Sequence, residues 1–483
     1  MNNFCETILY QDQAELMAKT RKAMVLHKTN LIRAETGSGK TIIASAMVAA
    51  SQKKHVRSIF VVPRRELLKQ TSKTYNKFQI PHSFVASGRP YNPFAYSYVA
   101  TARTLLNRIR AGVAPKASVI FLDEVHYSFD ESLEIANHYM AQGAWIIGLT
   151  ATPIRSDNKG LGRLFDNMIE GPSMRWLIDN KRLSDYRMFQ PAIPDLSMIK
   201  MVAGDYAKGQ IDDRMRADRV LIKGAVEHYR KRAMGMLNKV YCTSIAHSEQ
   251  VAYEFRLAGI PAAHISGKTP DDELIKIIQA FARREILSLA SCDLCTFGFD
   301  LSAASGYDVT IECMTDLQPT MSIAKQRQKY GRVLRYKDFP ALIFDNAGNS
   351  FRVDGQRKHG YPDDEISWSL ADGEIKKSNG TKAPPSRQCP ECYAVFPPAP
   401  KCPDCGFIFE VKGREVEEVE GELVEMTREQ REEMRRKESL SRRAEQGRAQ
   451  TLEDLIRVGR SRGMKYPAHW AARVMAARMR KNG

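Results

Sequence analysis

Short apolar runs alternate with segments of helical periodicity along most of the chain. In the first part, the apolar runs predict strands at Asn30–Ala34, Ser58–Val62, Val119–Leu122 and Trp145–Leu149. The pattern then returns, with strands expected at Lys239–Thr243, Ala262–Ile265, Leu287–Ala290, Val309–Cys313 and Ala341–Phe344. Strands that alternate with helices predict parallel sheets covered by helices. We therefore expect an α/β fold with two tandem parallel-sheet domains.

Changes in composition divide the chain into five parts. The expected boundaries are 1–182 and 206–372 for the two α/β domains, 183–205 for a polar connection between them, 373–411 for a cysteine-rich module and 412–483 for a charged helical tail. In the tail, a capping-box pattern predicts a helix from Thr427. A last helix is expected from about Thr451, and Trp470 lies in an apolar stripe that favours docking on the core, with DNA binding as the alternative.

The overall composition narrows the class of protein. With 43% hydrophobic residues over 483 positions, the chain can bury more than one core. No apolar run approaches the roughly 20 residues that span a bilayer, and the N-terminus lacks the pattern of a secretory signal. A cytoplasmic protein with no membrane partner is therefore expected. The net charge of +17 favours nucleic acid as a partner, because Lys and Arg displace counterions from phosphates; solvated surface charge is the alternative.

A glycine-rich loop follows the first predicted strand. Residues Ala34–Thr41 read A-E-T-G-S-G-K-T and precede a helical segment, which is the setting of a phosphate-binding loop. Lys40 is expected to reach the β- and γ-phosphates of a nucleotide, and Thr41 to offer its hydroxyl to Mg²⁺. The positive end of the following helix would add to the attraction. The residues expected to hold the nucleotide are Thr36, Gly37, Ser38, Gly39, Lys40 and Thr41.

Two carboxylates end the third predicted strand of this half. Buried carboxylates are costly unless they serve a metal ion or a proton transfer. Asp123 is expected to hold Mg²⁺ through its water shell, and Glu124 to orient and deprotonate the attacking water. An ordinary strand end is the alternative, and the phosphate-binding loop about 80 residues upstream disfavours it.

These segments resemble motifs I and II of the superfamily 2 helicases, near their DEAH and DExH branches. The resemblance implies two RecA-like domains that bind ATP and Mg²⁺. Thr150 and Thr152, within T-A-T-P, are similar to motif III, which couples the ATP site to nucleic-acid movement in that family. Gln11 resembles the Gln that reads adenine, although Ile8 stands where the family has Arg. His126 matches the residue that links this site to a Gln of the second half.

The second half carries further matches to the same family. Residues Gln328–Arg335 read Q-K-Y-G-R-V-L-R and match motif VI, so Gln328, Arg332 and Arg335 are expected to act in catalysis. Two Arg residues three apart share one helix face and can meet one phosphate, as an arginine finger does. A basic face that pairs with solvent or DNA is the alternative. A weaker match to motif V predicts that Asp300 lies near the ribose.

The resemblance also implies where nucleic acid lies. In this superfamily the strand crosses both domains and is held mainly through its phosphates, a role that suits hydroxyl groups and Arg side chains. The expected contacts are Arg64, Arg65, Thr101 and Arg103 in the first domain and Ser244 and Thr296 in the second. Residues 344–349, with 368–370 beyond, resemble RadD-like bacterial and phage DNA helicases, which favours DNA over RNA.

Four of the nine cysteines lie together after the second α/β domain. Cys389, Cys392, Cys402 and Cys405 form two C-P-x-C pairs. Four thiolates at this spacing suit tetrahedral Zn²⁺, and a closed Cys₄ site is structural rather than catalytic. An iron–sulfur cluster or rubredoxin-type iron is the alternative. We therefore expect a small zinc ribbon.

Together these patterns predict an Mg²⁺- and ATP-dependent DNA helicase or translocase. It would act on single-stranded or branched DNA in replication, recombination or repair. Three alternatives stay open: the motor subunit of a restriction system, an RNA helicase, and a nucleotide-gated clamp that does not unwind. Glu124, Arg332 and Arg335 are all present, which argues against an inactive ATPase.

Overall fold

The computed structural model consists of two compact units, residues 1–410 and 411–483. The residues it describes are 9–155, 159–191, 194–202, 204–292, 301, 307, 309–351, 358–372, 386–409, 449, 451–461 and 467–479. The expectations placed on Thr296, Asp300 and the helix from Thr427 lie outside the described residues. Among the described residues, every helix is too short or too polar to cross a bilayer.

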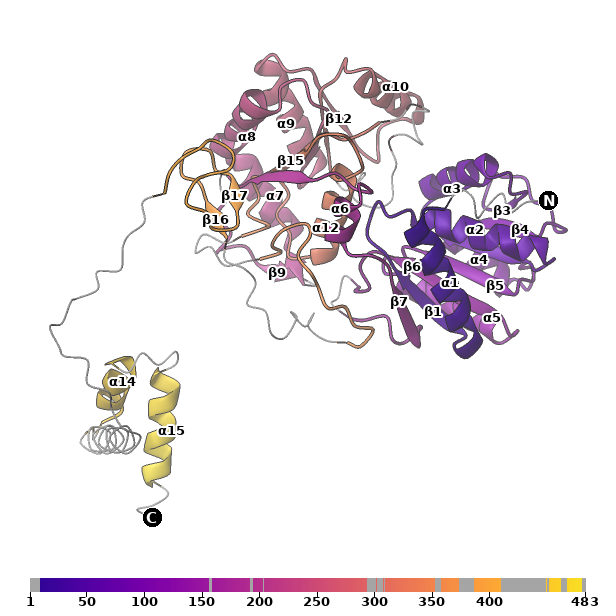
Figure 1. Cartoon of the computed structure of the whole chain (residues 1–483), viewed down its shortest axis with the longest axis horizontal. Helices are drawn as coiled ribbons and strands as arrows, with labels where there is room; N and C mark the ends of the chain where they lie inside the picture. Colours follow the sequence, from indigo (N-terminus) through magenta and orange to yellow (C-terminus); the bar gives the residue numbers. More distant parts are fainter. Residues whose placement is uncertain are drawn as a thin grey trace. The chain divides into compact units, whose positions relative to one another are not determined.

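Lobe 1 is built on a seven-stranded parallel sheet with the order β3-β4-β2-β5-β6-β1-β7 (Figure 1). Its strands are β1 Thr29–Arg33, β2 Ser58–Val62, β3 Ser83–Val85, β4 Ser97–Thr101, β5 Val119–Asp123, β6 Trp145–Thr150 and β7 Asn167–Glu170. Its helices are α1 Gln11–Leu26, α2 Lys40–Lys53, α3 Arg65–Lys77, α4 Ala102–Arg110 and α5 Phe129–Met140. Successive strand residues point to opposite faces, so Phe60 packs with α1–α3 and Ile59 with α4 and α5.

Lobe 2 repeats this architecture with a six-stranded parallel sheet, β12-β13-β11-β14-β15-β8. Its strands are β8 Tyr186–Phe189, β11 Asn238–Tyr241, β12 Ala262–Ile265, β13 Ser288–Ser291, β14 Cys313–Asp316 and β15 Ala341–Asp345, with a small hairpin of β9 Met201–Val202 and β10 Asp205–Tyr206. Its helices are α6 Met174–Asp179, α7 Lys208–Ala217, α8 Arg219–Arg232, α9 Ile245–Leu257, α10 Asp271–Ala282 and α12 Ile323–Val333. Helices α7–α9 pack on one face, and α6, α10 and α12 on the other. The predicted fold class is confirmed.

Two local expectations for lobe 2 were wrong. The segment at 183–205, expected to be only a connection, contains β8, which pairs with β15 along the edge of the sheet. Arg187 interrupts the apolar pattern by which this strand could be predicted. The strand tolerates the charge because Arg187 pairs with Asp404, more than 200 residues away. The strand expected at Val309–Cys313 begins only at Cys313, after Glu312 has bonded to the Leu237 amide and to Arg284.

The cysteine-rich module extends lobe 2 at β8. Its strands β16 Arg387–Gln388 and β17 Val395–Phe396 form an antiparallel pair, and Ala394 makes a bridge to Phe189 of β8. Three of its cysteines are buried in the same apolar cluster as Phe189 and Phe344. The module is therefore part of the lobe 2 core.

The segment after β15 returns to lobe 1. The Gly162 amide donates to the Leu370 carbonyl at 2.8 Å, and Leu370 packs on the apolar cluster under α4 and α5. A Cβ at Gly160 would overlap the Leu370 carbonyl, so the close approach requires glycine there. Trp368 lies against Arg33 of β1. This segment is a second connection between the lobes.

The second unit contains two helices, α14 Leu452–Ser461 and α15 Pro467–Met479. Thr451 and Asp454 exchange hydrogen bonds at the start of α14, as in a capping box. Leu455 and Ala471 form the centre of the contact, with Trp470 beside them. The apolar stripe that was predicted to dock on the core thus packs against α14.

Candidate nucleotide site and nucleic-acid face

The phosphate-binding loop connects β1 to α2, as predicted. Gly37 and Gly39 have φ of +90° and +89°, a left-handed backbone that glycine adopts without strain. The Lys40 ammonium lies inside the loop, 3.2 Å from the Ala34 carbonyl and 3.5 Å from that of Glu35. Lys40 and Thr41 are the first two residues of α2, so the helix N-terminus faces the loop. This geometry suits a bound phosphate group.

Gln13 reaches the loop, whereas Gln11 does not. The side-chain amide of Gln13 donates to the Ser38 carbonyl at 2.8 Å and accepts from the Tyr10 amide at 3.2 Å. Gln11 is exposed and bonds to Glu15. The family pattern pointed to the Gln next to Tyr10. The signal for Gln13 was its place on the buried side of α1.

The two carboxylates lie where β5 ends. Burial and the neighbouring Glu124 raise the pKa of Asp123 to about 7, against the opposing effect of Lys40. Glu124 has φ of +44°, an uncommon conformation for a residue with a side chain and one often found at functional sites. Its Oε2 is buried and lacks a hydrogen-bond partner among the described residues. The cost of burying these two carboxylates is therefore only partly offset by hydrogen bonds and by the charge of Lys40.

A chain of hydrogen bonds joins the lobes through His126. The Gln328 amide lies 3.2 Å from Nε2 of His126, and Nδ1 of the same ring lies 2.9 Å from the Thr150 hydroxyl. Thr150 in turn donates to the Thr152 carbonyl at 3.0 Å. Burial lowers the pKa of His126, so the ring is neutral and can accept at one nitrogen while it donates at the other. Four predicted residues thus meet at one interface.

Helix α12 carries most of motif VI and packs against the phosphate-binding loop. Gly331 is so close to Thr36 that a Cβ at 331 would overlap the Thr36 side chain. Arg332 is buried near the end of this helix. Arg335 lies beyond it, because the chain turns after Leu334 and bridges to Leu183. The expectation that both Arg residues share one helix face was wrong.

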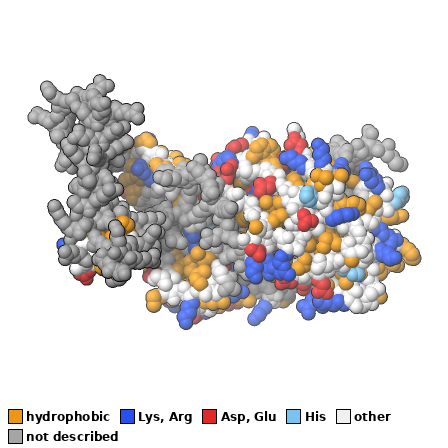
Figure 2. Space-filling view, turned by 90° about the horizontal axis from the view of Figure 1, so that it is seen from below, with side chains coloured by type: hydrophobic (Ala, Val, Ile, Leu, Met, Phe, Trp, Pro, Cys, Tyr) orange, Lys and Arg blue, Asp and Glu red, His pale blue; other side chains and the backbone are white. Residues whose placement is uncertain are grey.

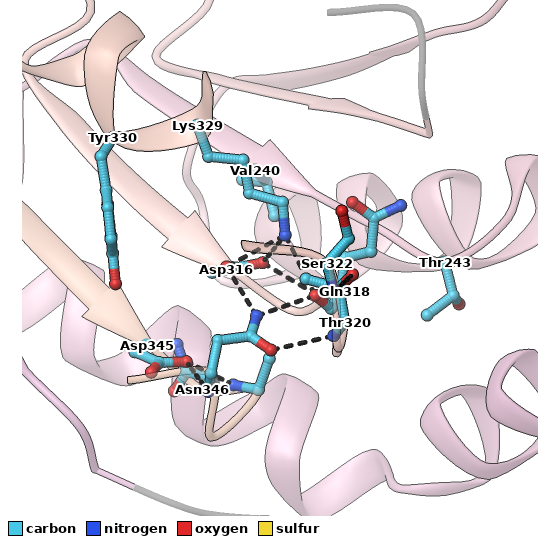
Figure 3. A network of polar contacts seen from close by, with 12 residues as sticks. Val240, Thr243, Asp316, Gln318, Thr320, Ser322, Lys329, Tyr330, Asp345 and Asn346 are labelled. Atoms are coloured by element: carbon cyan, nitrogen blue, oxygen red, sulfur yellow. Dashed lines mark hydrogen bonds and ion pairs between the residues drawn. The ribbon is translucent and has the colours of Figure 1, made fainter. Parts of the chain in front are cut away.

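A buried polar network within lobe 2 holds α12 in place (Figure 3). Lys329 pairs with Asp316 at 2.8 Å, and both side chains are fully buried. The Asn349 amide bonds to Asp316 at 3.0 Å, while Asp345 accepts three backbone amides from residues 347–350. Tyr330 bonds to the Ser350 hydroxyl at 2.8 Å. These contacts fix the helix that carries Gln328 and Arg332.

The predicted nucleic-acid contacts lie at the carboxyl ends of parallel strands. Arg64 and Arg65 follow β2, Thr101 and Arg103 follow or end β4, and Ser244 follows β11. Several of them have partners already: Arg64 bonds to the Tyr127 hydroxyl, Arg65 to the Ser87 carbonyl and Ser244 to the His247 amide. Strand ends in open α/β sheets are the usual ligand side. The face seen in Figure 2 shows Lys and Arg dispersed among other side chains, so charge alone marks no single patch there.

The four clustered cysteines converge on one point. Their Sγ atoms all lie within 4.8 Å of one another, with Cys389 3.6 Å from Cys405 and Cys392 3.5 Å from Cys402. Tetrahedral coordination at a Zn–S distance of about 2.3 Å requires sulfur atoms roughly 3.8 Å apart. The donor set therefore fits a tetrahedral metal ion.

Comparison with known proteins identifies the class. A protein-family profile described as "Type III restriction enzyme, res subunit" matches residues 6–155. The chain is 32% identical over 368 residues to a "51.5 kDa protein" of Lactococcus phage (isolate 7-9), which covers 76% of this chain and 75% of the phage protein. It is 26% identical over 340 residues to the "Putative mitochondrial ATP-dependent helicase irc3" of Schizosaccharomyces pombe, covering 66% of this chain and 54% of that protein.

The fold is similar to that of a solved fragment of a restriction-enzyme subunit. A solved structure titled "The fragment structure of a putative HsdR subunit of a type I restriction enzyme from Vibrio vulnificus YJ016" superposes with a TM-score of 0.54 at 19% identity, over 72% of this chain and 66% of that chain. The chain belongs to the superfamily 2 helicases of the DExH type. It is an ATP-hydrolysing, nucleic-acid-binding enzyme, and the predicted class and activity are confirmed.

Proposed function

We propose that this helicase is a DNA motor that hydrolyses ATP between its two lobes and moves along single-stranded or branched DNA in replication, recombination or repair. The observation that carries the proposal is the chain from Gln328 through His126 to Thr150. It connects the nucleotide side of lobe 1 to the motif VI helix of lobe 2, as a motor with a site between its lobes requires. The net charge of +17 and the RadD-like segments favour DNA.

The residues around the loop fit Mg²⁺-ATP. Three buried polar atoms of the loop, the end of β5 and motif VI have no hydrogen-bond partner among the described residues: Thr36 Oγ1, Glu124 Oε2 and Gln328 Oε1. Buried polar groups normally have partners, so this grouping suits a polar ligand. Lys40 would hold the β- and γ-phosphates, with Thr41 and Asp123 on Mg²⁺, which supplies charge neutralisation at the phosphates.

Each remaining residue then has one task. Glu124 orients the attacking water and takes its proton, while Arg332 stabilises charge on the transferred phosphoryl group. Arg335 would reach the same group from the turn after α12. Thr150 and Thr152 pass a change at His126 to the strand ends where Arg64, Thr101 and Ser244 would hold phosphates of the strand. The cysteines would hold structural Zn²⁺ in the lobe 2 core.

ATP turnover with different nucleic acids tests this proposal. The rate is measured without nucleic acid and with single-stranded DNA, forked DNA or RNA, beside Glu124→Gln as the inactive control. Strong stimulation by DNA, little by RNA and an inactive variant are expected. Equal stimulation by RNA would move the assignment to an RNA or dual helicase.

A motor of a restriction system is the second candidate, because the matching family profile is described as a subunit of a type III restriction enzyme. Such a motor translocates on duplex DNA without separating its strands. Displacement of a third strand from intact duplex, with no unwinding of a fork, would favour this candidate over the first.

A further inference from the structure

The turn that carries Glu124 is anchored at Val125 and at His126, whose ring contacts Thr150 and Gln328. Val125 is fully buried, and its amide donates to the Leu149 carbonyl at 3.3 Å, so this residue is held in lobe 1. On the other side, the Tyr127 amide donates to the Glu124 carbonyl at 2.9 Å and closes the turn. The position of Tyr127 therefore helps to set the left-handed backbone of Glu124.

The side chain of Tyr127 extends from this turn to Arg64. Its hydroxyl accepts a hydrogen bond from the Arg64 guanidinium, which also lies over the ring, 4.7 Å from its centroid. Arg64 follows β2 directly and is the N-cap residue of α3. Tyr127 is 43% exposed, whereas the His126 side chain beside it is 6% exposed. The ring thus spans from the surface to the buried catalytic turn.

A small cavity joins these groups. It has a volume of about 10 Å³ and is lined by Glu124, His126, Tyr127, Gln328 and Arg64, together with Pro63 and Leu67. A single water needs roughly this much space. Arg64, Tyr127 and Glu124 therefore line the same small cavity.

We propose that Tyr127 is a positioning residue that transmits nucleic-acid binding at Arg64 to the catalytic carboxylate Glu124. The inference rests on the proposed function, since it takes Arg64 as a contact to phosphates. A guanidinium has five N–H donors, so Arg64 can hold a phosphate and the Tyr127 hydroxyl together. A phosphate fixes Arg64, which orders the Tyr127 ring and narrows the conformations open to the turn.

Three variants test this role: Tyr127→Ala, Tyr127→Phe and, as a matched control, Tyr96→Ala. Tyr96 is also 43% exposed in lobe 1, but its ring makes an edge-to-face contact with His55 and does not line the cavity at Glu124. ATP turnover is measured without nucleic acid and at saturating single-stranded DNA, and DNA affinity by fluorescence anisotropy. Tyr127→Ala should lose about tenfold of the DNA-stimulated kcat, equivalent to about 1.4 kcal/mol, whereas the rate without DNA and the DNA affinity should each change by a clearly smaller factor.

Tyr127→Phe should retain most of the stimulation, because the ring still stacks on Arg64. In an Arg64→Ala background, Tyr127→Ala should cause no further loss at saturating DNA. Wild-type stimulation in Tyr127→Ala would overturn the inference, and so would an equal loss with and without DNA, which indicates a purely structural role. A wild-type enzyme that DNA fails to stimulate would instead refute the proposed DNA motor.

Discussion

Carboxylates end strands of both parallel sheets, but their surroundings differ. In lobe 2, Asp316 at the end of β14 is paired with Lys329 and bonded to Asn349, all within the core. In lobe 1, Asp123 at the end of β5 has a pKa raised to about 7, and Glu124 beside it has a buried oxygen without a hydrogen bond among the described residues. The contacts of Asp316 in lobe 2 are therefore saturated, while burial and Asp316 raise the pKa of the neighbouring Asp345. The contacts of Glu124 in lobe 1 are incomplete.

This difference distinguishes a network that stabilises the fold from one that can take part in a reaction. A saturated network fixes its elements and leaves nothing for a ligand to satisfy. An incomplete one is costly by itself and becomes favourable when a ligand completes it. Lobe 2 thus holds α12 against lobe 1, where the carboxylate of Glu124 is incompletely satisfied.

The largest expected effect comes from Glu124→Gln in the incomplete site. The substitution removes the base but keeps the shape, so ATP turnover should fall by about 10²- to 10⁴-fold. The melting temperature should stay within a few degrees of the wild-type value, measured by differential scanning calorimetry. A large loss of stability would contradict the contrast between the lobes.

Lys329→Met breaks the saturated network in lobe 2. It leaves Asp316 buried without its cation, which typically costs about 3–5 kcal/mol of the free energy of unfolding. Urea denaturation measures this loss. The control is Lys325→Met. Lys325 lies 2.8 Å from Asp205, and both side chains are partly exposed, so a loss below about 1 kcal/mol is expected. Similar losses in the two variants would refute the special role of the buried pair.

Metal removal should weaken lobe 2 more than lobe 1. Cys389, Cys392 and Cys402 lie in the lobe 2 core, so a strong chelator should lower the melting temperature of that lobe by about 5 °C or more. Hydrogen exchange should rise first in β8 and β17, and a colorimetric assay should detect the released Zn²⁺. Unchanged exchange after complete metal release would show that the ribbon does not support the core.

The smallest expected effect is on the pH dependence of lobe 2 stability. Burial lowers the pKa of both His247 and His359 to about 4, below the ordinary value of 6.5. The unfolded chain therefore binds more protons between pH 6.5 and 4, and stability falls as the pH drops through this window, by about 1–2 kcal/mol per residue at pH 5. Thermal unfolding of wild type, His247→Gln and His359→Gln at pH 5 and 7.5 checks this. Each variant should show a smaller loss between the two pH values than wild type.

The sequence by itself determined the features that short stretches of chain encode. The phosphate-binding loop, the strand that ends in Asp123 and the paired cysteines each depend on residues close together, because turn geometry and strand periodicity are local. The family resemblance added the order of the motifs and the class of enzyme.

Only the tertiary structure decided which distant residues meet. It placed Gln13 rather than Gln11 against the loop, and moved Arg335 off the α12 helix. It also brought Tyr127 to Arg64, a contact between residues 63 positions apart. Such contacts depend on how helices pack on a completed sheet, and no local pattern of hydrophobic and polar residues records that packing.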